Sequence, residues 1–223
     1  MKRQLARLAL TWRFKLLQRH RHKRLVLEHV EGLPLVILPH VFNPKLLRSG
    51  EFLVRQLSRP DLLRPASRVL DLGTGSGASA VAAARAGCAV VAVDINPEAV
   101  RCARINALLN QVECRVDARQ GDLFAPVAGE RFDVVLFNPP YYRGLPRDDL
   151  DFAWRSLDVI ERFAGQLREH LAPGGHALLV LSSDGEPTSF LRALDDGGYS
   201  TRAVARRDFV NEQMCVYRVA SAC

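Results

Sequence analysis

The stretch from Val69 to Gly77 constrains the fold more than any other part of the chain. It reads Val-Leu-Asp-Leu-Gly-Thr-Gly-Ser-Gly, so a short apolar run leads straight into three closely spaced glycines. The residues that follow, 77–86, are predicted to form a helix. Glycines in such a turn permit backbone angles that other residues avoid, and they let a ligand approach the main chain at the carboxyl end of a strand. The stretch therefore predicts a strand, a ligand-binding loop and a helix of an α/β fold.

Strand and helix signals alternate after this stretch. Apolar runs at Ala89–Val93, Val134–Phe137 and Ala177–Leu181 do not alternate with polar residues, which indicates strands buried on both faces of a parallel sheet. The last two strands follow each other without a helix between them, so they are expected to pair antiparallel. We predict an α/β, Rossmann-like fold: a seven-stranded, mostly parallel sheet with an antiparallel last strand and helices on both faces. The predicted strands are Arg68–Leu72, Ala89–Val93, Glu113–Ala118, Phe132–Phe137, His176–Leu181, Tyr199–Ala205 and Met214–Val219, and the predicted helices are Leu46–Leu57, 77–86, Pro97–Leu109, Asp151–His170 and Pro187–Asp196.

Pattern and charge divide the chain into three parts. Residues 1–24 are predicted to form a basic helical segment, because apolar residues recur there at helical spacing, nine residues are Lys or Arg and none is Asp or Glu. Residues 25–65 contain a predicted hairpin, with strands at Leu25–Val30 and Leu35–Leu38, and residues 66–223 form the main domain. The net charge of +7 belongs to the first part, since residues 25–223 carry 22 basic and 24 acidic residues.

The basic segment allows two interpretations. Either it is a helix that packs its apolar side chains on the body, or it is a basic arm that binds RNA, a ribosome or an acidic partner. It does not read as a secretory signal, because Arg7 and Arg13 interrupt its apolar stretch.

Cysteine usage and hydropathy bear on location and on metal binding. Five cysteines without a Cys-x-x-Cys pair predict reduced thiols in a cytoplasmic protein, and the six histidines show no ligand spacing, so we expect no metal site. The longest apolar run, Ala86–Val93, has eight residues, whereas a membrane-spanning helix needs about 20. We therefore expect no transmembrane segment.

Three carboxylates are predicted to meet at one edge of the sheet. Asp71, Asp94 and Asp122 each lie at or just after the end of one of three consecutive strands. Such a rim suits a cationic ligand without phosphate, and S-adenosylmethionine carries a sulfonium, an ammonium and a ribose whose hydroxyls a carboxylate can bind. The glycines also satisfy the dinucleotide pattern, with Asp94 as the ribose acid, so an NAD-dependent oxidoreductase is an alternative. Against it, Asp71 would repel a pyrophosphate.

A second motif follows the strand Phe132–Phe137. It reads Asn-Pro-Pro-Tyr, at Asn138, Pro139, Pro140 and Tyr141. The side-chain oxygen of Asn138 and the carbonyl of Pro139 can both accept hydrogen bonds from one planar NH₂ group, on which Tyr141 can stack. The motif therefore predicts an acceptor site for an amide or an aryl amine.

With both motifs in place, residues 66–220 resemble the class I S-adenosylmethionine-dependent methyltransferases, and in particular their HemK/PrmC-like branch of amino methyltransferases. Gly-Asp-Leu-Phe at 121–124 is a further motif of that branch, which also has a segment that covers the cofactor. Here that segment is Val41–Glu51, and it departs from the family pattern. The resemblance implies that the cofactor is held by Asp71, Gly73, Thr74, Gly75, Gly77, Asp94, Ile95, Asp122, Leu123 and Asn138, and that Asn138, Pro139, Pro140 and Tyr141 form the catalytic motif.

The resemblance implies an N-methyltransferase that acts on a planar NH₂ group, with a protein glutamine side chain as the preferred acceptor. A release factor or another protein would then be the partner. The alternatives are an exocyclic amine of adenine in RNA or DNA, reached with the help of residues 1–24, and a small-molecule amine. An oxidoreductase gives the Asn-Pro-Pro-Tyr motif no task, and a binding protein that had lost activity would be expected to have lost a motif.

Overall fold

The computed structural model describes residues 24–46, 48–145, 154–209 and 212–222. The basic segment lies outside these residues, except for its last residue. Within the described residues, no helix is long and apolar enough to cross a membrane.

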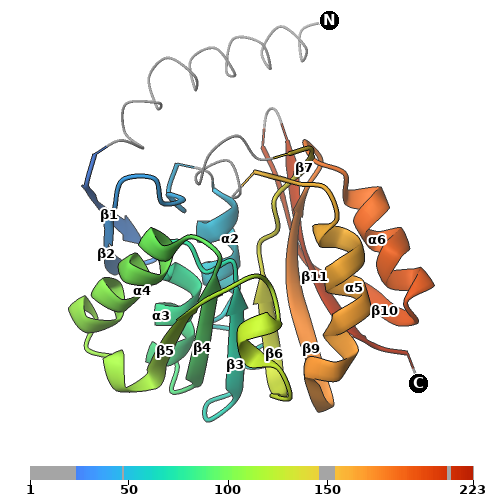
Figure 1. The fold of residues 1–223 in the computed structure, drawn as a ribbon, viewed down its shortest axis with the longest axis horizontal. Coiled ribbons are helices and arrows are strands. Elements are labelled where there is room, and N and C mark those ends of the chain that lie inside the picture. Colours follow the sequence, from blue (N-terminus) through green and yellow to red (C-terminus); the bar gives the residue numbers. More distant parts are fainter. Residues whose placement is uncertain (1–23, 47, 146–153, 210–211, 223) are drawn as a thin grey trace, which may run out of the picture.

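The core of the molecule is a seven-stranded sheet (Figure 1). The central strands run parallel, and the last strand of the chain, β11, pairs antiparallel with both of its neighbours, β9 and β10. The predicted fold class is therefore confirmed. In spatial order the strands are β10 (Tyr199–Asp208), β11 (Gln213–Ser221), β9 (Leu171–Ser182), β6 (Phe132–Phe137), β3 (Arg68–Leu72), β4 (Ala89–Asp94) and β5 (Val116–Gln120).

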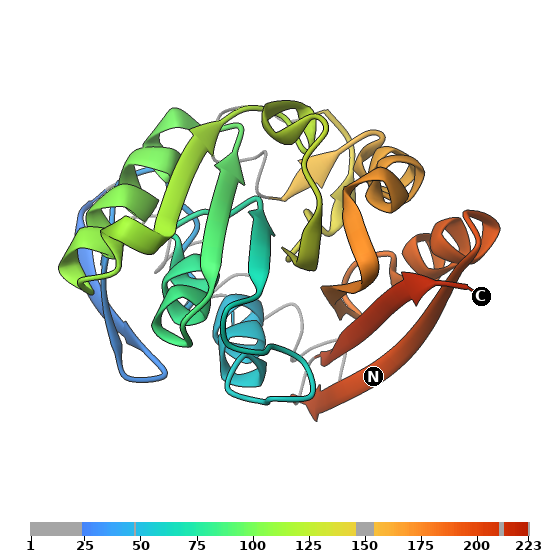
Figure 2. The same ribbon diagram turned by 90° about the horizontal axis from the view of Figure 1, so that it is seen from below.

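Helices cover both faces of the sheet, as Figure 2 shows. One apolar cluster joins alternate strand residues such as Val69 and Val134 to one set of helices, and a second cluster joins Leu70 and Val135 to the other set. This split follows from the strand period of two, which sends neighbouring side chains to opposite faces. The first set is α2 (Ser49–Gln56), α3 (Ala78–Arg85) and α4 (Pro97–Leu109), and the second is α5 (Val159–His170) and α6 (Pro187–Asp196).

A separate hairpin, β1 (Val26–Val30) and β2 (Leu33–Ile37), is tied to helix α4. The fully buried Asn106 accepts the backbone N–H of Val36 and donates to its carbonyl, both at 2.7 Å, and it also donates to the Ser76 carbonyl. A buried amide with all these partners is a strong directional clamp. It links the hairpin to the end of the glycine-rich loop.

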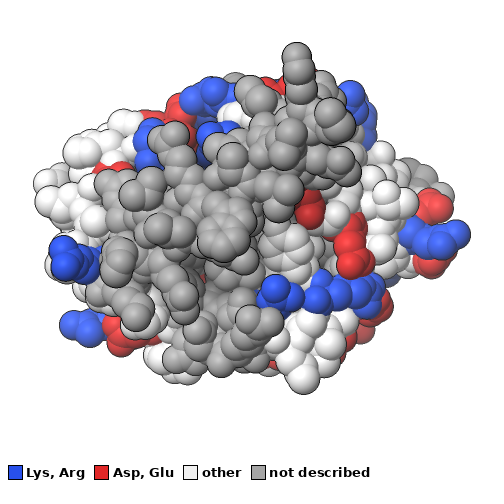
Figure 3. Space-filling model, turned by 90° about the horizontal axis from the view of Figure 1, so that it is seen from above, with Lys and Arg blue, Asp and Glu red and all other residues white. Residues whose placement is uncertain are grey.

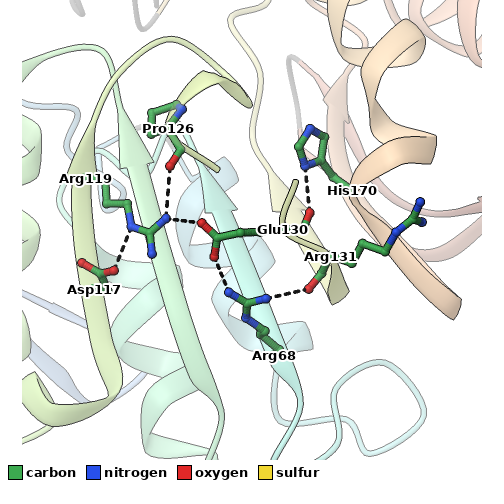
Figure 4. A network of polar contacts seen from close by, with 7 residues as sticks. All are labelled: Arg68, Asp117, Arg119, Pro126, Glu130, Arg131 and His170. Atoms are coloured by element: carbon green, nitrogen blue, oxygen red, sulfur yellow. Dashed lines mark hydrogen bonds and ion pairs between the residues drawn. The ribbon is translucent and has the colours of Figure 1, made fainter. Parts of the chain in front are cut away.

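A polar network braces the segment between β5 and β6, which includes the 3₁₀ turn Ala125–Val127 (Figure 4). The Glu130 carboxylate accepts from Arg68 of β3 and from Arg119 of β5, and the Arg119 side chain holds the pKa of that carboxyl below its usual range. The Glu130 carbonyl lies 2.9 Å from Nδ1 of His170 on α5. Each of these charged groups has a partner within the fold, so we assign this cluster of titratable groups a structural role.

The long helix predicted at Asp151–His170 is wrong in its first part. Residues 154–158 are not helical, and α5 begins at Val159. The Ser156 hydroxyl accepts the backbone N–H groups of Asp158 and Val159, at 3.4 and 3.2 Å, which satisfies donors that the start of a helix leaves open. Asp158 has φ −140°, outside the helical range.

The strand predicted at His176–Leu181 begins earlier, at Leu171. Its pairing with β6 shifts, because Leu171 lies opposite Phe132 while His176 lies opposite Val134. The residues between them form an irregularity that Gly175 permits, since a Cβ there would lie 2.9 Å from two carbonyl oxygens. Other boundaries differ as well: residues 113–115 form a 3₁₀ turn before β5, and α2 begins at Ser49 after Arg48 adopts φ +57°. The strands of the hairpin and the last two strands also differ from their predicted ranges, by one to three residues at an end.

Candidate functional site

The glycine-rich loop joins β3 to α3 at the carboxyl edge of the sheet. Gly73, Gly75 and Gly77 all have positive φ angles, between +55° and +79°. Gly77 also packs directly on α4, where a Cβ would lie 2.8 Å from the Cα of Ala103. Phe42 of the predicted covering segment lies over the loop, with its Cβ 3.4 Å from the position a Cβ would take at Gly75. The positive φ angles favour glycine at all three positions, and at Gly77 the contact with Ala103 excludes a Cβ as well.

Asp94, at the end of β4, holds the loop and the next turn together. One carboxylate oxygen accepts the Gly75 N–H at 2.8 Å, and the other accepts the Asn96 N–H at 2.9 Å. Burial raises the pKa of this carboxyl. The Asn96 side chain in turn donates at 3.0 Å to the carbonyl of His40, the residue just before the covering segment, so the start of that segment is anchored to the same turn. Each carboxylate oxygen still has a lone pair for a ligand hydroxyl.

Asp71 lies beneath the loop rather than on its surface. It is 4% exposed, and its carboxylate accepts the Thr74 hydroxyl at 2.6 Å. Burial raises the pKa of Asp71 to about 7. The geometry gives Asp71 and Thr74 a clear part in shaping the loop, and direct contact of Asp71 with a cofactor ammonium stays a prediction.

The third predicted carboxylate, Asp122, follows β5 and is brought to the same rim. The Gly121 N–H donates to the Asp94 carbonyl at 2.9 Å, which joins the ends of β4 and β5. Asp122 forms an ion pair with Arg162 of α5 at 2.6 Å, a partner that the sequence did not indicate. Ile95 lies exposed next to Asp94. The structure therefore groups these residues with the loop, and their contact with a cofactor stays a prediction.

The Asn-Pro-Pro-Tyr motif leaves the carboxyl end of β6, which is the direct neighbour of β3. The Tyr141 hydroxyl donates to the Asn138 side-chain oxygen at 2.9 Å, and the Asn138 amide NH₂ donates to the Ser49 hydroxyl at 3.1 Å. Burial raises the pKa of Tyr141. The sequence assigned Tyr141 only a stacking role, and it did not single out Ser49, which it placed inside a longer helix.

A small pocket lies beside this motif. It is lined by residues of the motif, of β7 (Tyr142–Arg143), of β8 (Arg155–Ser156) and of helix α5, together with Glu186. Arg143 pairs with Glu161 at 2.6 Å and with Glu186 at 3.2 Å, so its charge is compensated. The described side chains on the carboxyl-edge face carry both signs (Figure 3).

Trp154 and Phe42 meet above the site. Their rings lie 5.9 Å apart in a tilted arrangement, which connects the covering segment to the residues that precede α5. The sequence did not indicate this pair, because it placed Trp154 in a helix. Within the described ranges, no three His, Cys, Asp or Glu side chains come together as metal ligands would.

Comparison with known proteins decides the family. A sequence profile described as the methyltransferase small domain matches residues 32–197. The chain belongs to this family. The predicted resemblance to class I S-adenosylmethionine-dependent methyltransferases of the HemK/PrmC-like branch is thereby confirmed, and the protein is a methyltransferase.

Relatives extend the comparison. A Methanocaldococcus jannaschii protein, provisionally named a protein N5-glutamine methyltransferase, is 32% identical over 84% of this chain and 95% of its own length. A release factor glutamine methyltransferase of Gloeobacter violaceus is 35% identical over 70% of this chain and 59% of its own length. The chain thus spans nearly all of the first relative and little more than half of the second. Among solved structures, the E. cuniculi Mtq2–Trm112 complex, which is responsible for methylation of the translation termination factor eRF1, matches with a TM-score of 0.62 and 25% identity. The match covers 82% of this chain and 99% of that chain.

We expect Asp94→Ala to weaken cofactor binding much more than it lowers turnover at saturating cofactor. The variant loses the predicted ribose acceptor and frees the Gly75 N–H that shapes the loop. Loss of a charged hydrogen-bonding partner costs about 1.5–3 kcal/mol, so the dissociation constant for S-adenosylmethionine should rise roughly 10- to 100-fold. Isothermal titration calorimetry measures it. Asp117→Ala, which removes an exposed carboxylate paired with Arg119 on β5, is the matched control, and an unchanged constant in Asp94→Ala would refute the ribose assignment.

We also expect Asp71 to make stability fall as pH rises. Its folded-state pKa of about 7 lies above the ordinary value of 3.8, so the folded protein holds this proton more tightly than the unfolded chain. Stability from this group is complete below about pH 4 and is lost as pH rises toward 7. Between pH 5 and pH 8, the free energy of unfolding of the wild type should fall by on the order of 2 kcal/mol more than that of Asp71→Asn. Urea unfolding of both proteins at the two pH values measures this difference, and parallel pH profiles would contradict it.

Proposed function

We propose that this methyltransferase moves a methyl group from S-adenosylmethionine to a planar NH₂ group, namely the side-chain amide of a protein glutamine. The observation that carries the proposal is the position of the Asn-Pro-Pro-Tyr motif. The motif begins directly after β6. Strand β6 is paired along its length with β3, and β3 leads into the glycine-rich loop. An acceptor at the motif and a cofactor on the loop would therefore lie side by side.

On this proposal the loop and the acidic rim bind the cofactor. Gly73, Gly75 and Gly77 let its methionine part approach the backbone, and Thr74 and Asp71 keep the loop in shape. Asp94 would accept the ribose hydroxyls, with Ile95 beside it. The adenine would lie by the remaining rim residues, Asp122 and Leu123.

The motif would recognise and orient the acceptor. The Asn138 side-chain oxygen accepts the hydrogen bond from the Tyr141 hydroxyl through one lone pair. Its second lone pair can accept an N–H of the acceptor. The Pro139 carbonyl would take the other N–H, because a proline at that place leaves no competing donor. These two bonds direct the nitrogen lone pair at the methyl carbon. The N–C bond forms as the C–S bond breaks, sulfur keeps the bonding pair as a neutral thioether, and the nitrogen releases one proton to solvent. Positioning supplies most of the rate gain.

The relatives favour glutamine as the acceptor. Two of those named above carry names for glutamine methyl transfer, and so does a ribosomal protein uL3 glutamine methyltransferase of Bradyrhizobium diazoefficiens. A ribosomal RNA methyltransferase of Alcanivorax borkumensis is also similar, at 31% identity over 72% of this chain but only 45% of its own length. The M. jannaschii relative, by contrast, is matched over 95% of its own length, which supports the protein acceptor over the RNA.

The test supplies radiolabelled S-adenosylmethionine with four probes in separate reactions: a purified release factor, ribosomal protein uL3, small-subunit ribosomal RNA, and a whole cell extract that is fractionated afterwards. We expect label in protein, with mass spectrometry locating one added methyl group on a glutamine. Label confined to RNA, or to the small molecules of the extract, would overturn the glutamine assignment.

A further inference from the structure

A hydroxyl from helix α2 holds the amide of the acceptor motif. Ser49 is the first residue of α2 and is 1% exposed. Its hydroxyl oxygen accepts the Asn138 NH₂ at 3.1 Å across 89 residues of sequence. A helix that packs against α3 and β9 thus reaches the side chain that is proposed to bind the acceptor.

The Asn138 amide is held at both of its polar ends. The Tyr141 hydroxyl donates to its oxygen at 2.9 Å, and its NH₂ group donates to the Ser49 hydroxyl at 3.1 Å. Two hydrogen bonds at opposite ends of one amide strengthen one another and hold the side chain in one position.

The backbone beside Ser49 and at Tyr141 packs closely on its neighbours. At Gly50, next to Ser49, a Cβ would lie 2.6 Å from the Cβ of Pro44. At Gly185, in the loop after β9, a Cβ would lie 2.8 Å from the Tyr141 carbonyl oxygen. Such close packing holds the main chain at both places, so the two hydroxyl groups start from fixed backbone positions.

We propose that Ser49 is a positioning residue that holds the Asn138 side chain where its oxygen can meet the acceptor. The inference rests on the proposed function, since it assigns a task to the same site. Without the Ser49 hydroxyl, the NH₂ group of Asn138 loses its hydrogen-bond partner, and the side chain gains freedom to turn its oxygen away from the acceptor N–H. Ser49 thus acts through Asn138, without touching the acceptor.

The experiment compares four variants by two measurements. Ser49→Ala removes the hydroxyl, Ser49→Thr keeps one, Ser49→Val matches threonine in shape without it, and Ser58→Ala, at an exposed serine just beyond the same helix, is the control. The first measurement is the initial rate of label transfer to the protein fraction of a cell extract at saturating S-adenosylmethionine. The second is ¹⁵N relaxation of the Asn138 side-chain amide, assigned by its absence in Asn138→Asp.

We expect Ser49→Ala and Ser49→Val to lower the rate about tenfold or more and to make the amide mobile, with cofactor affinity changed less than about twofold. Ser49→Thr should transfer label faster than Ser49→Val, and its Asn138 side-chain amide should be more rigid. Ser58→Ala should match the wild type in both measurements. An amide as rigid in Ser49→Ala as in the wild type overturns the inference, and so does a mobile amide with an unchanged rate. If the wild type labels no protein, the proposed acceptor is wrong, and the relaxation data still decide whether Ser49 fixes the amide.

Discussion

Asn138→Ala is expected to abolish methyl transfer while the protein still folds and binds S-adenosylmethionine. The variant removes the oxygen that is proposed to orient the acceptor nitrogen and to stabilise the charge that develops on it. Removal of one such group from an enzyme typically costs 10²–10³-fold in turnover. The cofactor site should change little, because the loop is held by Asp94, Asp71 and the packing of Gly77 instead. Single-turnover label transfer and calorimetric titration of the cofactor measure the two effects separately.

The control for this prediction is Asn43→Ala. Asn43 is a buried asparagine of the covering segment that caps the backbone N–H groups of Lys45 and Leu46, so its loss tests the general cost of losing an asparagine near the site. That variant should lose stability but keep most of its turnover. If Asn138→Ala instead weakens cofactor binding and turns over normally at saturation, the acceptor role of Asn138 is wrong.

Local signals in the sequence were sufficient for much of the sheet and for two helices. Pro97–Leu109 and Pro187–Asp196 match the observed helices, because a proline in the first turn marks where each begins. The strand Phe132–Phe137 matches as well, since its apolar run is bounded by charge on one side and prolines on the other. These boundaries depend only on neighbours in the chain, so periodicity and turn chemistry could find them.

The features that escaped prediction depend on contacts between distant residues. Ser49 gains its partner from β6, Asp122 gains Arg162 from α5, and Phe42 gains Trp154. Nothing in the local sequence around Ser49 distinguishes a serine that starts a helix from one inside it. The predicted residues of the glycine-rich loop are brought together as expected, but the structure adds that Asp71 lies beneath the loop, which the order of residues along a strand cannot reveal.

Gly77→Ala is expected to lower both the stability of the fold and the affinity for the cofactor. Two costs add at this position. With φ +79°, an alanine must adopt a left-handed conformation, at about 1–2 kcal/mol. Its Cβ would also lie 2.8 Å from the Cα of Ala103, and overpacking against backbone costs roughly 1–3 kcal/mol more. Against the 5–15 kcal/mol that stabilise a typical domain, this is a large fraction.

Gly129→Ala separates the two costs, because Gly129 has φ +78° but no atom within 4 Å of the position its Cβ would take. Urea unfolding should therefore show Gly77→Ala to be destabilised by roughly 1–3 kcal/mol more than Gly129→Ala. Since relief of the clash must move α3 away from α4, and the loop with it, S-adenosylmethionine affinity should fall in Gly77→Ala and stay at the wild-type value in Gly129→Ala. Equal destabilisation of the two variants would mean that backbone strain, and not the contact with Ala103, is the reason for glycine at this position.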